Sequence, residues 1–163
     1  MPRRHVRGGV LDVAGLVVEE EVGLELAQEL ALVQAAQEHR LVDLVRRFWE
    51  LMASNDFDAV AAVLAPAFVL EWPQSHERIR GIDRFVRMNQ EYPAHGRWLF
   101  DVHRIVGGES EAASDVSITD GVQTARAISF FTVAHGQITR IVEFWPEPYA
   151  APAHRSHLVE PLD

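Results

Sequence analysis

The sequence has no cysteine and no lysine. Without cysteine there is no disulfide framework, no thiolate metal site and no thiol nucleophile, and a cytoplasmic location is the default expectation. All 15 basic residues are arginine, which excludes a Schiff base on a lysine of the protein. Phenolic donors are limited to Tyr92 and Tyr149. The absent residue types therefore constrain the catalytic mechanism more than the motifs that are present.

Long apolar runs, positive charge and phosphate loops are also lacking. No apolar run approaches the roughly 20 residues of a membrane-spanning helix, and acidic residues follow the N-terminal arginines too closely for a secretory signal. The net charge of −9 argues against a nucleic-acid partner, because phosphate binding needs a basic face. Gly107-Gly108 joins two predicted strands and opens no helix, so it is not a phosphate loop. We expect no cofactor, no membrane and no nucleic acid.

What is present is typical of one globular domain, with 163 residues of which 48% are apolar. Residues 1 to about 18 lack a clear period and predict a flexible leader. From Glu19 apolar residues recur at three- and four-residue steps as far as Met52, which predicts a helix. The pattern fits either one helix or two helices broken near Glu38-His39.

Shorter elements follow. Asn55 or Asp56 is the expected N-cap of a helix from Phe57 to Leu64, which Pro66 closes. Ala67 to Trp72 predicts a strand ending at Pro73, with a brief second strand at Arg78 to Arg80. Gly81 then opens a helix over Ile82 to Glu91, which ends before Pro93.

The remainder alternates as strands. Trp98 to Val106 and Glu111 to Thr119 flank a turn at Gly107-Gly108, and Asp120-Gly121 predicts a second turn. A long hairpin from Val122 to Tyr149 turns at His135-Gly136. Helices followed by a four-strand antiparallel meander predict an α+β fold, with helices on one face of a curved sheet.

The hairpin turn decides which side chains share a face. A three-residue loop over Ala134 to Gly136 sets Ala127 opposite Glu143 and Ser129 opposite Ile141. A two-residue loop sets Ser129 opposite Val142 and turns Glu143 away. We favour the three-residue loop, because a final glycine suits a type I turn with a bulge.

The order of elements resembles the nuclear transport factor 2-like superfamily, in its SnoaL-like and ketosteroid-isomerase-like branch. The residues that carry the resemblance are Asn55-Asp56 before the second helix, the strand that ends at Pro73, Arg80-Gly81 before the third helix, and Glu143-Phe144-Trp145 at the end of the hairpin. The resemblance implies a cone-shaped sheet around an apolar cavity, usually in a homodimer. Large apolar residues on both faces of the hairpin strand, Ile128 and Phe130 against Phe131, fit a dimer through the sheet face. It assigns residues 37–149 to this domain, 1–36 to a leader and helical extension, and 150–163 to a tail.

The resemblance also shows which chemistry is missing. The positions of the isomerase tyrosine, aspartate base and protonated aspartate fall at Phe48, Trp72 and about Ser129. SnoaL-like cyclases commonly continue with an aspartate where this chain has Pro146, followed by Glu147. Steroid-type proton shuttling by that machinery is therefore not expected, because each of the three groups is replaced.

The cavity implied by the resemblance has a predicted lining. We expect its ligand-binding residues to be Phe48, Met52, Trp72, Phe85, Met88, Tyr92, Trp98, Ser129, Phe131 and Trp145. These residues would bind a small apolar molecule, with indole N–H groups available to orient it.

Glu143 is the sharpest catalytic candidate, because burial in an apolar cavity would raise its pKa and suit a general acid or base. We favour the plainer alternative, a surface glutamate or one paired with Arg126 or Arg140. For Asp115 we likewise favour a cross-strand pair with Arg126, set by a two-residue turn at Asp120-Gly121.

Histidines supply the second candidate and the metal question. His103 is a possible neutral base, although a packing residue is the commoner role at such a position. His154 and His157 are three residues apart, but no third ligand is placed by the sequence, so we expect no metal.

Two functional classes fit these observations. One is an isomerase, cyclase or hydrolase that moves a proton through Glu143 or His103. The other is a non-catalytic binding or dimerisation module of the same fold, since the three isomerase positions are replaced and lysine and cysteine are absent.

Overall fold

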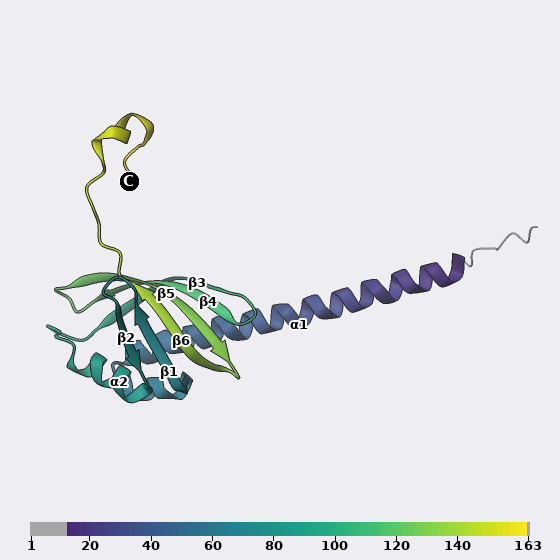
Figure 1. Ribbon diagram of the computed structural model, residues 1–163, viewed down its shortest axis with the longest axis horizontal. Coiled ribbons are helices and arrows are strands. Elements are labelled where there is room, and N and C mark those ends of the chain that lie inside the picture. The colour runs from purple at the N-terminus through teal and green to yellow at the C-terminus, as the bar shows by residue number, and fades with distance from the viewer. Residues whose placement is uncertain (1–12, 163) are drawn as a thin grey trace, which may run out of the picture. The chain divides into compact units, whose positions relative to one another are not determined.

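The computed structural model describes residues 13–162 (Figure 1), with side chains from residue 22 onward. The chain divides into two compact units, residues 1–37 and 38–163. Most of the expected leader, residues 1–12, lies outside the described residues. The expected helix begins earlier than Glu19, because helix α1 runs from Val13 to Ser54, with Glu38 and His39 inside it.

The described part of the first unit is helical and solvent-exposed. Every side chain from 22 to 37 is exposed. The large apolar residues among them are Val22, Leu24, Leu26, Leu30, Leu32 and Val33. None of the helices described here combines the length and apolar character needed to cross a membrane.

The second unit is built on one six-stranded sheet in the order β2-β1-β6-β5-β4-β3. Its strands are β1 (Leu64–Trp72), β2 (Glu77–Arg80), β3 (Leu99–Gly107), β4 (Glu111–Thr119), β5 (Thr124–Ala134) and β6 (Gln137–Phe144). All neighbours are antiparallel except β1 and β6, which are parallel. With the 3₁₀ helices η1 (Phe57–Val63) and η2 (Ala153–Leu158) and the helix α2 (Ile82–Glu91), this confirms the α+β prediction of helices packed on a curved sheet.

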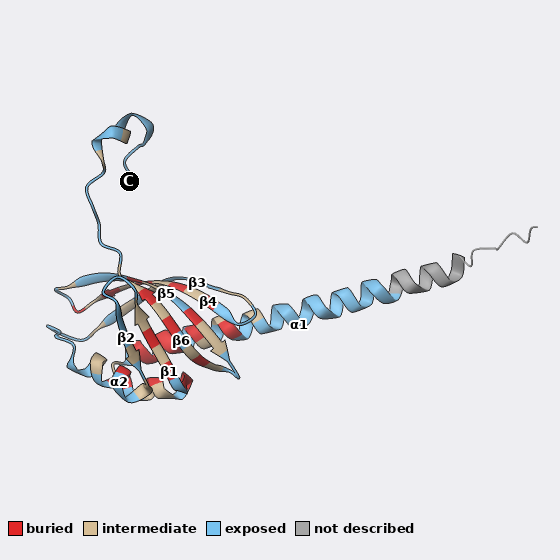
Figure 2. Cartoon of the chain, viewed as in Figure 1, coloured by how far each residue is buried: buried red, intermediate tan, exposed pale blue. Residues whose placement is uncertain are grey.

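The core lies between the inner face of this sheet and the helical segments of the same unit (Figure 2). Strand alternation supplies one side, because Ala112, Ser114, Val116 and Ile118 of β4 are buried and the residues that alternate with them are not. Leu41, Val45 and other apolar residues of α1 supply the other side. Rings of α1 and β5 meet edge to face, with Phe48 and Phe131 centroids 5.5 Å apart.

The turn between β5 and β6 corrects the expected register. Ala134 pairs with Gln137, so the loop has two residues, His135 and Gly136, and both have positive φ, as a type I′ turn requires. The favoured three-residue loop was therefore wrong. A bulge beyond Val133 then shifts the pairing by one residue, so that Ser129 lies opposite Glu143.

With the two-residue turn alone, the Glu143 side chain would point to the outer face of the sheet. The bulge returns it to the inner face. Ile138 and Ile141 of β6 are both buried although they are three residues apart, because the bulge places an additional residue between them. Glu143, two residues after Ile141, is consequently buried as well. The inward side of Glu143 thus depends on the two-residue turn and the bulge acting together.

The loop between β4 and β5 has four residues, 120–123, since Thr119 pairs with Thr124. The expected two-residue turn at Asp120-Gly121 was wrong. Asp120 is the organising side chain of this loop. Its carboxylate accepts hydrogen bonds from the backbone N–H groups of His95 (2.8 Å), Val122 (2.9 Å) and Gln123 (2.7 Å), and from Gln123 Nε2 (2.8 Å).

The junction between α1 and η1 also differs from the expectation. Asp56 is the N-cap residue of η1, but its side chain makes no capping hydrogen bond. Asn55 has a positive φ of 62°, which asparagine tolerates better than most residues. Its side chain instead exchanges two 2.8 Å hydrogen bonds with the backbone of Trp98, which joins the end of α1 to the beginning of β3. Pro66 lies inside β1 and does not close the preceding helix.

The Asp120 carboxylate should make the stability of the domain sensitive to acid. The His95 backbone N–H, followed by those of Gln123 and Val122, holds the pKa of Asp120 well below its usual range. A depressed folded-state pKa contributes stability above the unfolded pKa, and that stability is lost as the pH falls below about 4. We expect Asp120→Asn to lower the melting temperature by several degrees at pH 7, and this difference from wild type to narrow near pH 3.

The matched control is Asp101→Asn, because Asp101 has a side chain that is 80% exposed. Thermal melts of both variants between about pH 3 and pH 7 check the expectation. A deficit of Asp120→Asn that stays the same across this range would contradict it.

Candidate functional site

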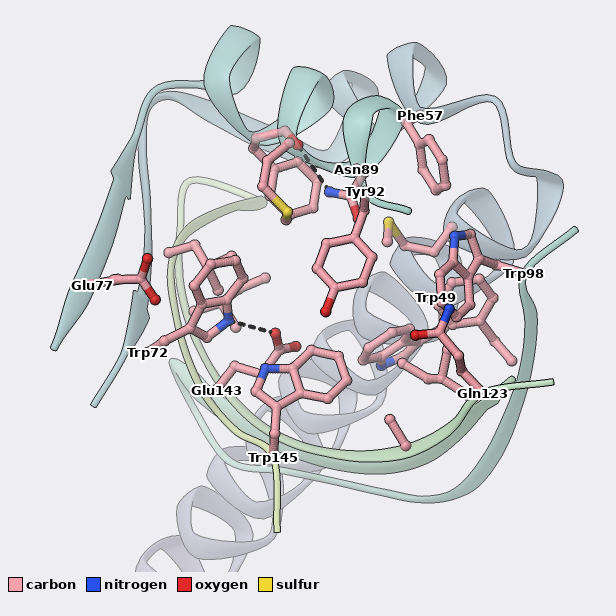
Figure 3. Close-up of a pocket in the computed structure, with 18 of the residues that line it drawn as sticks. Trp49, Phe57, Trp72, Glu77, Asn89, Tyr92, Trp98, Gln123, Glu143 and Trp145 are labelled. Carbon is pink, nitrogen blue, oxygen red and sulfur yellow. Dashed lines mark hydrogen bonds between the residues drawn. The ribbon is translucent and has the colours of Figure 1, made fainter. Parts of the chain in front are cut away.

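An aromatic pocket opens on the inner side of the sheet and has a volume of about 830 Å³ (Figure 3). This volume is within the usual range for sites that bind small molecules. Its apolar wall consists of Phe48, Trp49, Met52, Phe57, Leu70, Trp72, Phe85, Met88, Tyr92, Trp98, Phe100, Ile118, Ala125, Ile141 and Trp145. Its polar residues are Gln74, Ser75, Glu77, Asn89, Gln123, Thr124, Glu143 and Glu147.

Glu143 is the buried ionisable group of this pocket. The residue is 8% exposed, and each carboxyl oxygen has one hydrogen-bond partner. Trp72 Nε1 donates to Oε2 at 2.9 Å, and Ser129 Oγ lies 2.9 Å from Oε1. Burial raises the pKa of Glu143, while the hydrogen bonds from Trp72 and Ser129 oppose that rise. The group is therefore oriented and biased toward the protonated form.

The two arginines considered as partners for Glu143 are engaged elsewhere. Arg140 pairs with Glu71, which also pairs with Arg78 at 2.6 Å. Arg126 donates to Asp115 at 2.6 Å, as expected for that pair, although the register places Asp115 opposite Ile128. The favoured interpretation of Glu143 as a surface or arginine-paired residue was wrong, because the bulge of β6 turns it to the inner face.

The carboxylates of Glu71, Asp115 and Asp120 each have hydrogen-bond donors that stabilise the ionised form. Arg140 and Arg78 lower the pKa of Glu71, and Arg126 lowers that of Asp115. Asp120 has several backbone N–H groups. Among the residues that the structure describes, Glu143 has two neutral partners and no cationic one, and its pKa moves in the opposite direction. Glu143 thus differs from Glu71, Asp115 and Asp120 both in its partners and in the direction of its pKa shift.

The aromatic wall is held in place by contacts from several elements. Asn55 holds the backbone of Trp98, and the rings of Tyr92 and Trp98 meet at a centroid distance of 6.0 Å. Gln74 fixes the end of β6, since its side chain accepts a hydrogen bond from the Trp145 backbone N–H at 2.5 Å. Figure 3 shows the Tyr92 hydroxyl and the Glu143 carboxyl both directed into the pocket.

Most of the residues nominated from the sequence line this pocket. They are Phe48, Met52, Trp72, Phe85, Met88, Tyr92, Trp98, Glu143 and Trp145. Ser129 is fully buried behind Glu143, and Phe131 lies in the core, so neither is a lining residue. The ligand-binding and catalytic roles of these residues stay predictions.

His103 lies outside the pocket. Its Nε2 is 2.6 Å from Ser117 Oγ, its Nδ1 is 3.8 Å from Asp101, and its side chain is 41% exposed. The structure thus separates the two catalytic candidates and leaves Glu143 as the one within the site. No group of three or more potential metal ligands occurs among the residues that the structure describes.

Several lining residues were missed by the sequence reasoning. Trp49 could have been found from helical periodicity, because it lies four residues after Val45, and Phe57 could have been found as the first residue of the next helical segment. Gln123 and Thr124 border the pocket only because the four-residue loop after β4 positions them there. Nothing in the local sequence indicates that position.

Comparison with known proteins agrees with this architecture. Residues 45–141 match the model of the SnoaL-like domain family. A candidate ketosteroid isomerase from Kribbella flavida is 34% identical, with a TM-score of 0.72 over 77% of this chain and 92% of that one. The chain therefore belongs to the SnoaL-like domain family, with the nuclear transport factor 2-like fold.

More distant structures show the same fold. An epoxide hydrolase of the LEH-like type from M. tuberculosis is 21% identical, with a TM-score of 0.56 over 67% of this chain and 84% of that one. A candidate SnoaL-like polyketide cyclase from Jannaschia is 18% identical, with a TM-score of 0.57 over 66% and 86%. A search of curated protein sequences gave no match. Isomerases, cyclases and hydrolases thus share this fold, and the fold does not choose among them.

Burial of Glu143 predicts a stability effect with a defined sign. A folded-state pKa raised above the ordinary value of 4.5 contributes stability that is complete below that value and is lost as the pH rises through the folded-state pKa. Glutamine copies the neutral form, because its carbonyl can accept from Trp72 and its amide can donate to Ser129. We expect Glu143→Gln to be at least as stable as wild type near pH 8, and to lose that advantage near pH 4.

Urea unfolding at both pH values measures the effect. Glu91→Gln is the control, since the Glu91 side chain is 62% exposed. A Glu143→Gln variant that is clearly less stable than wild type at pH 8 would show that the fold depends on the ionised carboxylate.

Proposed function

We propose that this chain is a proton-transfer enzyme that binds a small hydrophobic substrate in the aromatic pocket and uses Glu143 as general acid or base. The observation that carries the proposal is a buried carboxyl group at the pocket wall that has two neutral hydrogen-bond partners and, within the described part of the chain, no cationic one. General acid–base catalysis is most efficient when the pKa of the group lies near the working pH. Burial moves Glu143 in that direction.

The two partners of Glu143 suit both protonation states. The Trp72 indole can only donate, so Oε2 accepts its hydrogen bond in either state. The Ser129 hydroxyl can donate to the ionised carboxylate and accept from the protonated one, by rotating its hydrogen. Ser129 is therefore a positioning residue. Its buried hydroxyl can keep a hydrogen bond to Glu143 in both protonation states.

The family supports a reaction of this type and differs in the groups that perform it. A similar structure is described as a candidate ketosteroid isomerase, and others are described as an epoxide hydrolase and a candidate polyketide cyclase. Isomerisation, epoxide opening and cyclisation can each use proton transfer at a substrate carbon or oxygen. Phe48 and Trp72, which stand at the expected isomerase positions, leave Glu143 as the proton carrier proposed for this chain.

A non-catalytic binding module is the second candidate. The replacement of the isomerase groups at Phe48, Trp72 and Ser129 favours it, because a pocket can keep its shape after losing its chemistry. In that case Glu143 would serve as a hydrogen-bond donor to the ligand. We also propose a cytoplasmic location, on the basis of the absence of cysteine.

The outer face of the sheet is the proposed dimer interface. Phe130 on β5 is 49% exposed and Val106 on β3 is 53% exposed. The ring of Phe130 meets that of Phe144 at 6.2 Å, so aromatic surface of two adjacent strands is presented together. Apolar residues gathered on the exposed face of a sheet are typical of a surface that another subunit covers.

Glu143 should be required for base catalysis on a generic substrate. The base removes the C3 proton of 5-nitrobenzisoxazole, the N–O bond breaks, and a coloured cyanophenolate forms. We expect Glu143→Gln to lower the rate by at least about 100-fold, within the range for general-base removal. The wild-type rate should rise with pH as Glu143 ionises, at a higher pH than for an ordinary glutamate.

The matched control is His103→Gln, which should keep the wild-type rate because His103 lies outside the pocket. Equal rates for wild type and Glu143→Gln would contradict the enzymatic proposal. Tight binding of the reagent without any acceleration would favour the binding module.

The dimer proposal predicts that Phe130→Glu yields a monomer, since the new charge would be buried without a partner in the interface. Leu158→Glu is the control, because Leu158 is 76% exposed in the C-terminal segment and should leave the dimer intact. Light scattering after size-exclusion chromatography measures both masses. A wild-type monomer, or a dimer that Phe130→Glu does not affect, would refute this interface.

A further inference from the structure

The charges around the pocket have one sign. Its charged lining residues are Glu77 on β2, Glu143 on β6 and Glu147 after β6, and none of the described lining residues is an arginine or a histidine. Glu77 and Glu147 are exposed, and exposed glutamates are negative at neutral pH. A ligand that enters this pocket meets Glu77 and Glu147 at the exposed part of the pocket and Glu143 at the buried part.

The pocket wall is also rich in aromatic side chains. All four tryptophans of the chain line it, namely Trp49, Trp72, Trp98 and Trp145. The face of an indole ring attracts a cation more strongly than that of any other side chain, and desolvation increases the attraction. Tryptophan rings and carboxylates in one pocket are a typical environment for a positively charged nitrogen.

Glu143 adds an energetic reason for a cationic ligand. An ionised carboxylate at this depth is destabilising, and the hydrogen-bond partners that the described residues supply are a neutral indole and a hydroxyl. Glu71 and Asp115, by contrast, have arginine partners within the chain. Among the described residues no side chain supplies the charge that would complement an ionised Glu143, and a cationic ligand in the pocket would supply it.

We propose that this pocket takes a hydrophobic amine, whose ammonium group pairs with Glu143 beside the tryptophan rings, and that it rejects hydrophobic acids. The proposal rests on the proposed function only in placing the ligand in the same pocket. It requires no reaction, so it can be tested by binding alone.

The proton balance of this binding is defined. An ammonium ligand that enters while Glu143 is protonated releases the Glu143 proton to solvent, and the bound state is an ammonium–carboxylate pair. Affinity for the amine should therefore rise with pH until Glu143 ionises in the free protein. The other titratable groups that line the pocket are Glu77, Tyr92 after α2, and Glu147, whereas the lining residues from α1 and β5 carry no titratable group.

Three probes with the same apolar body separate charge from shape. They are 1-adamantanamine, 1-adamantanol and 1-adamantanecarboxylate, titrated at 0.15 M salt with tryptophan fluorescence as the readout. At this salt concentration, charges on the distant surface are largely screened. We expect the amine to bind about tenfold more tightly than the alcohol, equivalent to about 1.4 kcal/mol, and the carboxylate at least about tenfold more weakly.

Two variants assign the preference to the buried group. Glu143→Gln should bring the amine to within about threefold of the alcohol and remove the pH dependence of amine binding, while alcohol binding persists. Glu91→Gln removes the same charge from an exposed position outside the pocket and should leave the ranking unchanged. Persistent alcohol binding shows that the Glu143→Gln pocket is still folded.

The proposal is overturned if the carboxylate binds as well as the alcohol, if the amine has no advantage, or if the advantage survives in Glu143→Gln. These outcomes are independent of the benzisoxazole rate. Charge selection without catalysis would refute the proposed enzyme and keep this inference. Catalysis without charge selection would do the reverse.

Discussion

The pairing of Ser129 with Glu143 across β5 and β6 is the constraint on which the site depends. Successive side chains of a strand alternate between faces, so a shift of one residue would move this carboxyl to the outer surface. The two-residue turn at His135-Gly136 and the bulge beyond Val133 together set the pairing. The burial of Glu143, its contact with Trp72 and its place in the aromatic pocket all follow from that register.

The same constraint explains why the site is energetically unlike the rest of the sheet. On the outer face, Glu71 and Asp115 are matched by arginines from adjacent strands. On the inner face, apolar and aromatic residues surround the buried carboxyl of Glu143, which has no cationic partner among the described residues. The buried Glu143 carboxyl is thus unfavourable for stability. A buried ionisable group with a perturbed pKa at a pocket wall is typical of a functional residue. Proton transfer and selection of a basic ligand are two uses of that single group.

Much of the fold could be predicted from local patterns. The bounds of α2 and β4 were predicted as observed, because glycine, proline and strict alternation mark their ends. The face of the sheet to which the Glu143 side chain points could not be predicted reliably. A three-residue loop and a two-residue turn with a bulge place it on the same face, and the bulge has no local signature in the sequence. The sequence also could not show that Arg126 and Arg140 are not partners of Glu143. That depends on tertiary contacts, because each arginine binds another carboxylate on the outer face.

Direct titration of Glu143 tests the central claim most closely. The side-chain carboxyl carbon of Glu143 can be followed by NMR in glutamate-labelled protein, with its resonance assigned by its absence in Glu143→Gln. The account predicts a midpoint clearly above the ordinary value of 4.5, and above the midpoints of the exposed glutamates, together with a shift of the Trp72 indole N–H signal at the same pH. A midpoint shared with the exposed glutamates would show that the carboxyl is solvated, and would contradict the account.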